Sequence, residues 1–229
     1  MIAKEVIMKI RKKGLVALVM AVALVGLTAC GNSSSSVAMT GGWSMPIQDA
    51  VELPADVKAG FDKVAGKDLV PVALVAQQVV SGTNDMILCR SGNEYRMIVV
   101  YRDLQGTATI TNNVPFLITD YTNGGDKLQT TPLAGGWHVP SETTSIALPK
   151  DAKTAFNSGI LSFSGNDIEP MALLATQVVA GTNYAILCKV TPMAQNAVSS
   201  IQVLIIYSDT QKNASVTASS PVDPKKYSK

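Results

Sequence analysis

The chain has 229 residues, of which 47% are hydrophobic, 16% are charged and only 5% are aromatic. These fractions exclude a wholly disordered polyelectrolyte and an aromatic-rich sugar-binding protein. The formal net charge is +2, but residues 1–29 hold five of the 19 basic side chains and one of the 17 acidic ones, so residues 30–229 carry a net charge of −2. This remainder lacks the positive field that favours nucleic acid, and no nucleic-acid partner is expected.

The first 29 residues have the three parts of an export signal. A basic stretch ends at Lys13, an apolar run covers residues 15–27, and small residues follow. As a helix this run would cover roughly 20 Å, whereas a permanent span must cross about 30 Å of hydrocarbon. We therefore expect residues 1–29 to be a signal peptide and not a transmembrane helix.

The apolar run ends in Leu27-Thr28-Ala29-Cys30, which resembles the bacterial lipobox. The resemblance implies that the chain is cleaved before Cys30 and that diacylglycerol is attached to its thiol. The protein would then be anchored to a membrane of the bacterial cell envelope and face outside the cytoplasm. The polar residues 30–40 suit a tether. The alternative is an ordinary export signal in which Cys30 is incidental.

The rest of the chain is a tandem repeat, and such a duplication predicts domain number more firmly than composition does. Residues 41–46 recur at 135–140, 53–61 at 148–156, 71–90 at 170–189, and 101–103 at 207–209. The offset grows along the chain, and since insertions gather in connections, two loops are longer in the second repeat. We expect a domain over 41–120, a linker over 121–134, a second domain over 135–220 and a polar tail over 221–229.

Each repeat is predicted to form one helix followed by an antiparallel meander. The first helix begins at Pro54 with Val57, Phe61 and Val64 on one face, and the second covers about 149–158. Strands are predicted over 69–80, 83–90, 94–103 and 107–117, and over 170–179, 182–190, 197–209 and 214–218. Strands joined so closely must be antiparallel. A sheet around one helix buries one of its faces, which gives an α+β unit.

The turn between the first two long strands resembles the first hairpin of the cystatins, and of the stefin branch above all, whose signature is Gln-x-Val-x-Gly. The first repeat carries Gln78-Val-Val-Ser-Gly82 and the second carries Gln177-Val-Val-Ala-Gly181. Gly41-Gly42 and Gly135-Gly136 resemble the glycines of the cystatin N-terminal trunk. The resemblance implies two tandem cystatin-like domains, each with one helix packed on a curved antiparallel sheet.

The resemblance further implies a reversible wedge-type inhibitor of papain-like cysteine proteases. In such an inhibitor the trunk and two hairpin tips line up on one edge and plug the cleft of the protease. Glycine would permit close backbone approach, and valine would supply apolar area. The contacts implied are Gly41, Gln78, Val79, Val80, Gly82 and Leu104 in the first domain, and Gly135, Gln177, Val178, Val179 and Gly181 in the second.

The second hairpin departs from the family pattern. Secreted cystatins place Pro-Trp there and stefins a Leu-Pro-Gly type of turn, whereas this chain has Leu-Gln-Gly at 104–106 and Thr-Gln-Lys at 210–212. An alternative therefore stays open, in which the scaffold is a non-inhibitory surface binding or structural module. In that case the Gln-x-Val-x-Gly turns are retained because glycine suits a tight turn.

The remaining chemistry-bearing residues favour packing over catalysis. Trp43 and Trp137 are expected to close the core, and Cys89 and Cys188 to be buried free thiols. His138 is the only histidine, so neither a thiol enzyme nor a metal site has its minimum parts. We expect a monomer with no enzymatic activity, no metal and no cofactor.

Overall fold

The computed structural model describes residues 41–46, 52–122, 128–129, 135–140 and 148–228. The predicted signal peptide, Cys30 and the polar tether lie outside the described residues. Within the described ranges, no helix is long and apolar enough to cross a membrane.

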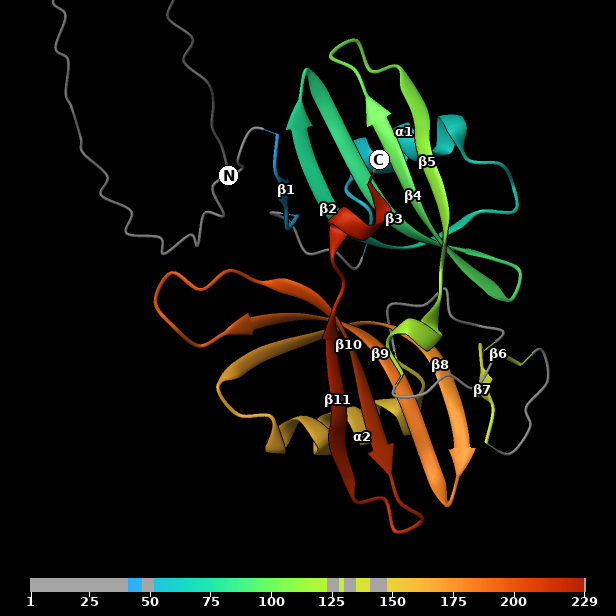
Figure 1. Ribbon diagram of the computed structural model, residues 1–229, viewed down its shortest axis with the longest axis vertical. Helices are drawn as coiled ribbons and strands as arrows, with labels where there is room; N and C mark the ends of the chain where they lie inside the picture. Colours follow the sequence, from blue (N-terminus) through green and yellow to red (C-terminus); the bar gives the residue numbers. More distant parts are fainter. Residues whose placement is uncertain (1–40, 47–51, 123–127, 130–134, 141–147, 229) are drawn as a thin grey trace, which may run out of the picture. The chain divides into compact units, whose positions relative to one another are not determined.

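The first repeat is one helix, α1 (Ala55–Val64), on a five-stranded antiparallel sheet (Figure 1). The strands lie in the order β1-β2-β3-β4-β5, which is also their order along the chain. They are β1 (Trp43–Ser44), β2 (Val70–Val80), β3 (Gly82–Ser91), β4 (Glu94–Arg102) and β5 (Ala108–Phe116). A 3-10 turn, η1 (Ile118–Asp120), ends the repeat. The helix therefore lies in the chain between the edge strand β1 and the long meander.

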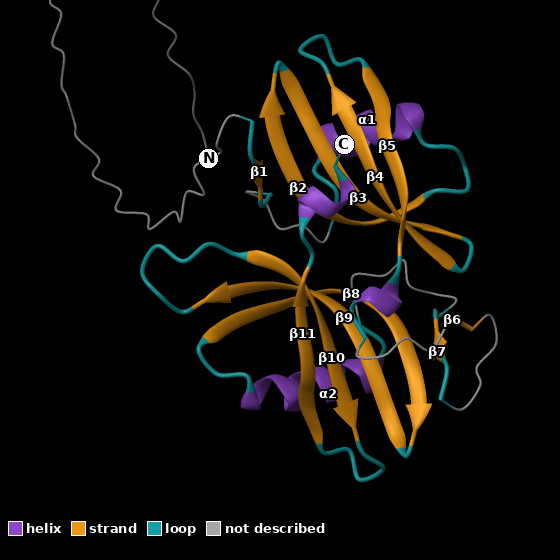
Figure 2. Cartoon of the chain, viewed as in Figure 1, coloured by secondary structure: helices purple, strands orange, loops and turns teal. Residues whose placement is uncertain are grey.

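The second repeat has the same plan, with α2 (Lys150–Gly159) and a sheet in the order β11-β10-β9-β8-β7-β6. The strands are β6 (Leu128–Gln129), β7 (Trp137–His138), β8 (Asn166–Val179), β9 (Gly181–Pro192), β10 (Ser200–Ser208) and β11 (Ala214–Pro221). A 3-10 turn, η2 (Ile160–Ser162), follows α2, and another, η3 (Pro224–Tyr227), follows β11 near the end of the chain. Among the strands of the described residues, β6 and β7 pair in parallel and all other pairs are antiparallel. The predicted α+β class in two tandem units is confirmed (Figure 2).

Proline begins both helices. Pro54 and Pro149 immediately precede α1 and α2, and their carbonyl oxygens accept hydrogen bonds of 2.8 Å from the amides of Lys58 and Lys153. A fixed proline φ suits this position because the first turn needs no amide donor there. The helix face predicted from Val57, Phe61 and Val64 packs on the sheet, with Val57 and Phe61 almost fully buried.

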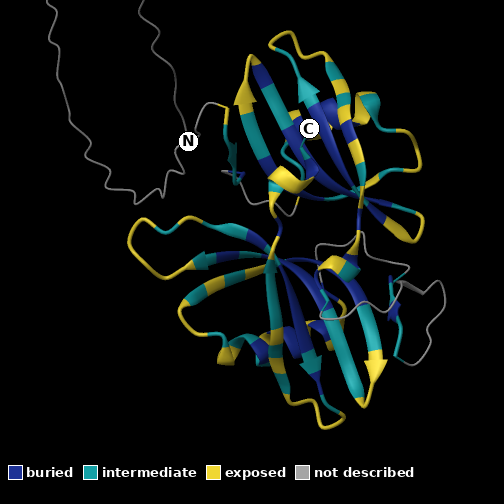
Figure 3. Cartoon of the chain, viewed as in Figure 1, coloured by how far each residue is buried: buried dark blue, intermediate teal, exposed yellow. Residues whose placement is uncertain are grey.

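Both faces of each sheet are buried, so the expectation that each sheet buries only one face was wrong. In the first sheet Leu74 and Ile87 pack toward α1, whereas Met86 and Leu88 join a second cluster on the opposite face. The strands carry runs of consecutive apolar residues and not an alternation, as at 86–89, which is the pattern of a strand covered on two sides. Figure 3 shows the buried strand centres in dark blue.

The opposite faces of the two sheets form one shared hydrophobic core. It contains residues of both repeats, among them Met97 from β4 and Leu187 from β9. The Tyr95 hydroxyl donates a 3.0 Å hydrogen bond to the carbonyl of Leu174, and Arg90 Nη1 donates one of 2.8 Å to the carbonyl of Pro140. The repeats are therefore two units of secondary structure that share a single core.

The segment expected as a polar tail packs against the first repeat. Val222 and Tyr227 are 5% and 2% exposed. The Tyr227 hydroxyl lies 2.8 Å from that of Tyr121, and its ring stacks on Phe116 with centroids 5.8 Å apart. Lys226 pairs with Asp120 at 2.6 Å. The chain thus returns from β11 to hold the two repeats together.

The cysteine and tryptophan predictions are confirmed. Cys89 and Cys188 are free and fully buried, each on the helix side of its own sheet. Burial raises the pKa of the Cys89 thiol to about 12 and raises that of Cys188 as well. Trp137 is buried in the shared core, and Trp43 packs half-buried against it. Neither thiol is in a state that favours reaction at neutral pH.

Candidate functional site

In each repeat the trunk glycine and two turns come to the same end of the sheet. The amide of Gly41 donates a 2.9 Å hydrogen bond to the carbonyl of Val79, beside the β2–β3 turn. Thr83 pairs with Arg102 across β3 and β4, so the β4–β5 turn lies next to the β2–β3 turn. We call Gly41, 78–82 and 103–107 the first binding edge, and their counterparts Gly135, 177–181 and 209–213 the second binding edge.

The glutamines predicted as protease contacts are used inside the protein. Gln78 Nε2 donates a 2.9 Å hydrogen bond to the carbonyl of Gly41, and Asn84 Nδ2 donates one of 2.8 Å to Gln78 Oε1. The second repeat does the same, with Gln177 Nε2 to the carbonyl of Gly135 at 2.8 Å and Asn183 Nδ2 to Gln177 Oε1 at 2.7 Å. Each glutamine therefore braces its trunk against the first hairpin.

The two motif glycines are required by packing within the hairpins. Gly82 has φ of +143° and Gly181 of +135°. A Cβ at Gly82 would lie 2.4 Å from the carbonyl oxygen of Arg102, and one at Gly181 would lie 2.3 Å from that of Ser208. Because β4 or β10 occupies this space, only glycine fits. The predicted reason, close approach to a partner, is not needed to explain these glycines.

The remaining predicted contacts are exposed apolar side chains. Val79 and Val80 are 42% and 37% exposed, Val178 and Val179 are 51% and 42% exposed, and Leu104 is 81% exposed. Figure 3 shows the turns at both edges as exposed segments. These side chains are the exposed apolar groups of the two edges.

The second turns have the same conformation in both repeats despite their different residues. Asp103 Oδ1 accepts hydrogen bonds from the amides of Gln105 and Thr107 at 2.9 and 2.7 Å. Asp209 Oδ1 accepts from the amides two and four residues further on, both at 2.8 Å. Lys212, with φ of +67°, takes the left-handed place that Gly106, at +81°, holds in the first repeat. The second turn is therefore retained in shape and changed only in its side chains.

Sequence reasoning missed these two aspartates, although the recurring Tyr-x-Asp was a signal for them. The amide of Thr107 holds the pKa of the Asp103 carboxyl below its usual range, with help from neighbouring turn amides. The side-chain amide of Asn213 leads the same effect at Asp209. A carboxylate that accepts several N–H groups is stabilised in its charged form.

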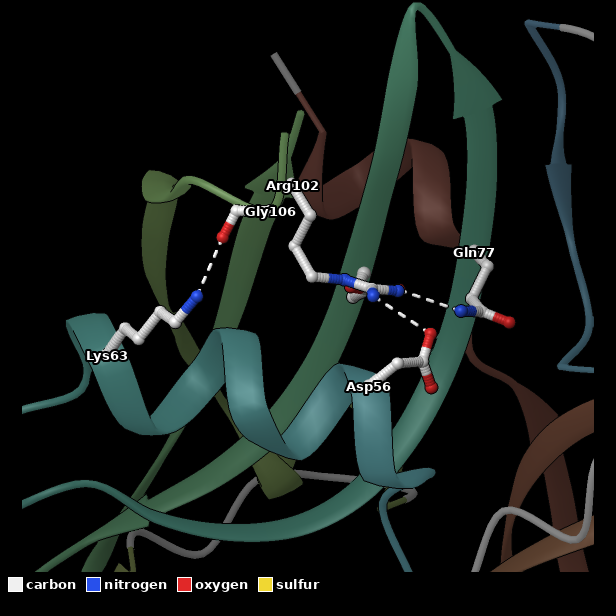
Figure 4. A network of polar contacts seen from close by, with 6 residues as sticks. Asp56, Lys63, Gln77, Arg102 and Gly106 are labelled. Carbon is white, nitrogen blue, oxygen red and sulfur yellow. Dashed lines mark hydrogen bonds and ion pairs between the residues drawn. The ribbon is translucent and has the colours of Figure 1, made fainter. Parts of the chain in front are cut away.

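An ion-pair network centred on the buried Asp85 lies beneath the first binding edge (Figure 4). Asp85 is fully buried, and Arg102 Nη2 donates to its Oδ1 at 3.2 Å while Gln77 Nε2 donates to the same oxygen at 2.7 Å. Arg102 Nη1 also pairs with Asp56 of α1 at 2.8 Å. Burial of Arg102 works against its charge, but the two carboxylates outweigh it and raise the pKa of the guanidinium. The network fixes the start of α1 against β4.

The end of α1 is fixed to the same edge by a further contact. Lys63 Nζ donates a 2.8 Å hydrogen bond to the carbonyl of Gly106 (Figure 4). In the second repeat Lys212, which corresponds to Gly106, instead lies 3.7 Å from Asp151 of α2, with both side chains mostly exposed. Each second turn is thus in contact with its helix, but through different residues.

Groups of three or more histidine, cysteine, aspartate or glutamate side chains that could hold a metal ion do not occur among the described residues. His138 lies in β7 opposite Thr176, and its Nδ1 is buried without a hydrogen-bond partner. The polar residues that gather at the binding edges are amides, aspartates and tyrosines. The hydrogen bonds described above join these residues to the turns and the trunk of their own repeat.

Comparison of the chain with protein-family models, with curated proteins and with solved structures finds no match. The resemblance to cystatins therefore depends on the motif residues and the strand order of this chain alone.

Proposed function

We propose that this protein is a lipid-anchored bacterial envelope protein whose binding edges act as reversible wedges against papain-like cysteine proteases. The observation that carries the proposal is the common position of Gly41, the β2–β3 turn and the β4–β5 turn at one end of the sheet, repeated at the second binding edge. A helix between the first and second strands of a meander sheet is also what the cystatin resemblance implies. A cystatin-like identity for both repeats is part of this proposal.

Binding of this kind would be non-covalent. The valines of either edge, with Leu104 at the first, would lose water inside a narrow cleft. The bracing of the trunk by Gln78 and Gln177 would lower the conformational entropy lost on binding, because the loops are ordered beforehand. In this proposal the glutamines and glycines shape the wedge, and the exposed side chains contact the protease.

The two edges would differ in strength. The first presents Leu104, 81% exposed, where the second has Thr210 and, two residues later, the charged Lys212. The first edge thus has more exposed apolar side chain, which favours binding in the apolar cleft of a protease. We expect the first binding edge to bind more tightly than the second.

The proposed anchor is the lipid on Cys30. A Cys30→Ser variant should not be lipidated, and the protein should leave the membrane fraction or remain as an unprocessed precursor. Fractionation of cells with metabolic labelling by a fatty acid would test this. A Cys30→Ser protein that is still labelled and still membrane-bound would refute the lipid anchor.

The inhibition test should use the intact chain from residue 31, because the two repeats share a core. Papain and a cathepsin would be titrated with it, and inhibition should be reversible and competitive. A triple variant, Val79→Ser/Val80→Ser/Leu104→Ser, should raise the inhibition constant of the first edge roughly tenfold or more, since each exposed side chain loses apolar area. A double variant, Val178→Ser/Val179→Ser, should weaken the second edge by a smaller factor.

A matched control removes exposed apolar area away from both edges. Leu161 and Met193 are 83% and 73% exposed, so Leu161→Ser/Met193→Ser should leave inhibition unchanged. Glycine substitutions are unsuitable here, because a side chain at Gly82 or Gly181 would collide with the neighbouring strand. Inhibition that survives both edge variants together would show that the edges are not the contact surface.

A second candidate function is a non-inhibitory surface binding or structural module. It is favoured by the internal contacts of the motif, because Gln78, Gln177, Gly82 and Gly181 all have structural reasons that involve no protease. If the intact chain fails to inhibit several papain-like proteases at high micromolar concentration, this candidate replaces the first.

A further inference from the structure

Each first-hairpin tip is held by a tyrosine from the neighbouring strand. The Tyr101 hydroxyl, on β4, donates a 2.8 Å hydrogen bond to the carbonyl of Ser81. The Tyr207 hydroxyl, on β10, donates one of 2.6 Å to the carbonyl of Ala180. Ser81 and Ala180 are the single residues between the two strands of each hairpin, so both bonds reach the outermost point of the turn.

The ring of each tyrosine also fills the space beside the tip glycine. A methyl group on Gly82 would lie 2.8 Å from Tyr101 Cε2, and one on Gly181 would lie 2.9 Å from Tyr207 Cε2. The tip is therefore packed on one side by the ring and bonded at its carbonyl by the hydroxyl. Glycine allows the ring this position because it has no side chain of its own.

The tyrosines belong to a row of cross-strand neighbours that also holds the trunk. Gln78 pairs with Asn84, and Asn84 pairs with Tyr101, in adjacent strands of one sheet. The second repeat has the same row, formed by residues 177, 183 and 207. Directly opposed residues of neighbouring strands point to the same face of a sheet. One row thus connects the trunk, through the glutamine, to the tip, through the tyrosine.

We propose that Tyr101 and Tyr207 are positioning residues, which hold the first-hairpin tips in their binding conformation before a partner arrives. Strand pairing ends at the residues on either side of this one-residue turn, and the glycine next to it adds backbone freedom, so the tyrosine supplies a further constraint at the outermost point. Its ordering would otherwise cost free energy at the moment of binding. The part of this inference that concerns binding rests on the proposed function, whereas the part that concerns the ordering of the tip does not.

The test uses the intact chain from residue 31 with Tyr101→Phe/Tyr207→Phe, which keeps both rings and removes both hydroxyls. Hydrogen exchange of the backbone amides at 79–83 and 178–182 should become about fivefold faster, the size expected for one lost hydrogen bond at each tip. The matched control is Thr111→Val/Thr217→Val. These threonines also donate from a side chain to a backbone carbonyl in both repeats, to Val99 at 3.3 Å and Ile205 at 3.1 Å, within the strands. The control should leave exchange at the tips unchanged.

The second measurement is the kinetics of protease binding. The tyrosine variant should dissociate about fivefold faster and associate within about twofold of the parent, because an ordered interface affects dissociation most. Tip exchange that equals that of the parent or the control would overturn the ordering of the tips by the tyrosines, and faster exchange with unchanged dissociation would overturn the part of the inference that concerns binding. If the parent does not inhibit at all, the proposed function fails, and the exchange measurement alone decides whether the tyrosines order the tips.

Discussion

The two repeats form the same helix-on-sheet unit, but they fill the space between helix and hairpins with different chemistry. The first uses an ion pair between the buried Asp85 and the partly buried Arg102. The second has Tyr184 and Ser208 at these positions and no charge there. Two further positions change with them, listed here as first and second repeat: Gln77 and Thr176, Gly60 and Ala155.

These residue differences depend on one another, because the side chain of Arg102 occupies space beside the helix. A Cβ at Gly60 would lie 2.4 Å from Cδ of Arg102, so the helix needs glycine where the arginine passes over it. Ser208 leaves that space free in the second repeat, and Ala155 is buried there at 2% exposure. Tyr184 packs against the helix-side core, which takes the place of the ion pair. The same fold thus accepts either a charged or an uncharged set of residues between the helix and the hairpins.

This difference teaches that the ion pair is not a requirement of the fold. A buried pair stabilises little relative to well-packed neutral residues, because both charges lose their water. Removal of one partner is costly, however, since the other charge stays buried. The first repeat should therefore be sensitive to single changes that the second tolerates.

The largest effect should come from Arg102→Met. Asp85, fully buried, would lose its cation, and we expect a loss of about 3–5 kcal/mol in the free energy of unfolding. Ser208→Ala is the matched change in the second repeat and should cost about 1 kcal/mol or less. Urea unfolding of the intact chain measures both. Equal losses from the two variants would contradict the contrast between the repeats.

Placing the corresponding residues of the second repeat into the first repeat should recover much of the stability that is lost when Arg102 is removed. The variant combines four changes that copy the second repeat: Gly60→Ala, Gln77→Thr, Asp85→Tyr and Arg102→Ser. It should be about 2–4 kcal/mol more stable than Arg102→Ser alone, because no charge is left buried without a partner. The comparison uses the same urea measurement. A quadruple variant no more stable than the single one would mean that the backbones differ enough to prevent the exchange.

The effect of Gly60→Ala on the free energy of unfolding should change sign according to whether Arg102 is present. With Arg102 present we expect a loss of about 1–2 kcal/mol from overpacking against the arginine stem. In the Arg102→Ser background the same change should stabilise by about 1 kcal/mol or less, because alanine is the better helix former. A double-mutant cycle by thermal or urea unfolding gives the coupling. Additive effects would show that Arg102 yields to the methyl group without cost.

The smallest expected effect is a loss of stability at low pH, and it should occur in both repeats. The folded-state pKa values of Asp103 and Asp209 are lowered, so their contribution to stability is present above the unfolded pKa near 3.9 and is lost as the pH falls through the folded values. Carboxyl titration by NMR should give midpoints below about 3.9 for both. Asp56, opposed by burial but favoured more by Arg102, should join them only in the first repeat. An Asp56 midpoint that Arg102→Ser leaves unchanged would contradict this origin.

Local features of the sequence predicted the elements well. Pro54 and Pro149 mark the helix starts, and the turns at Ser81 and Ala180 separate the strands. The strand ends were the weakest part, since β8 begins at Asn166 and not at Pro170. Its first residues pair with the extended end of β9. That pairing is a tertiary property which strand propensity does not encode.

The sequence predicted where the candidate site lies, but not what its glutamines and glycines contact. The repeat and its glycines located both edges, because turns depend on local residue types and these recur in both repeats. The sequence could not tell that Gln78 would bond to Gly41, or that Gly82 would lie under Tyr101, since these contacts join residues many positions apart. Asp85 and Arg102 carried no signal either, except that their counterparts in the second repeat differ.

The sequence by itself determined the duplication, the class of each unit, and the order of helix and hairpins, because these follow from local patterns of proline, glycine and apolar residues. Only the tertiary structure decided that the two sheets share a core and that the last residues return to the first repeat. Tyr95 with Leu174 and Tyr227 with Tyr121 are 79 and 106 residues apart. The continuous apolar strands required a cover on both faces, but what covers the second face is set by long-range packing.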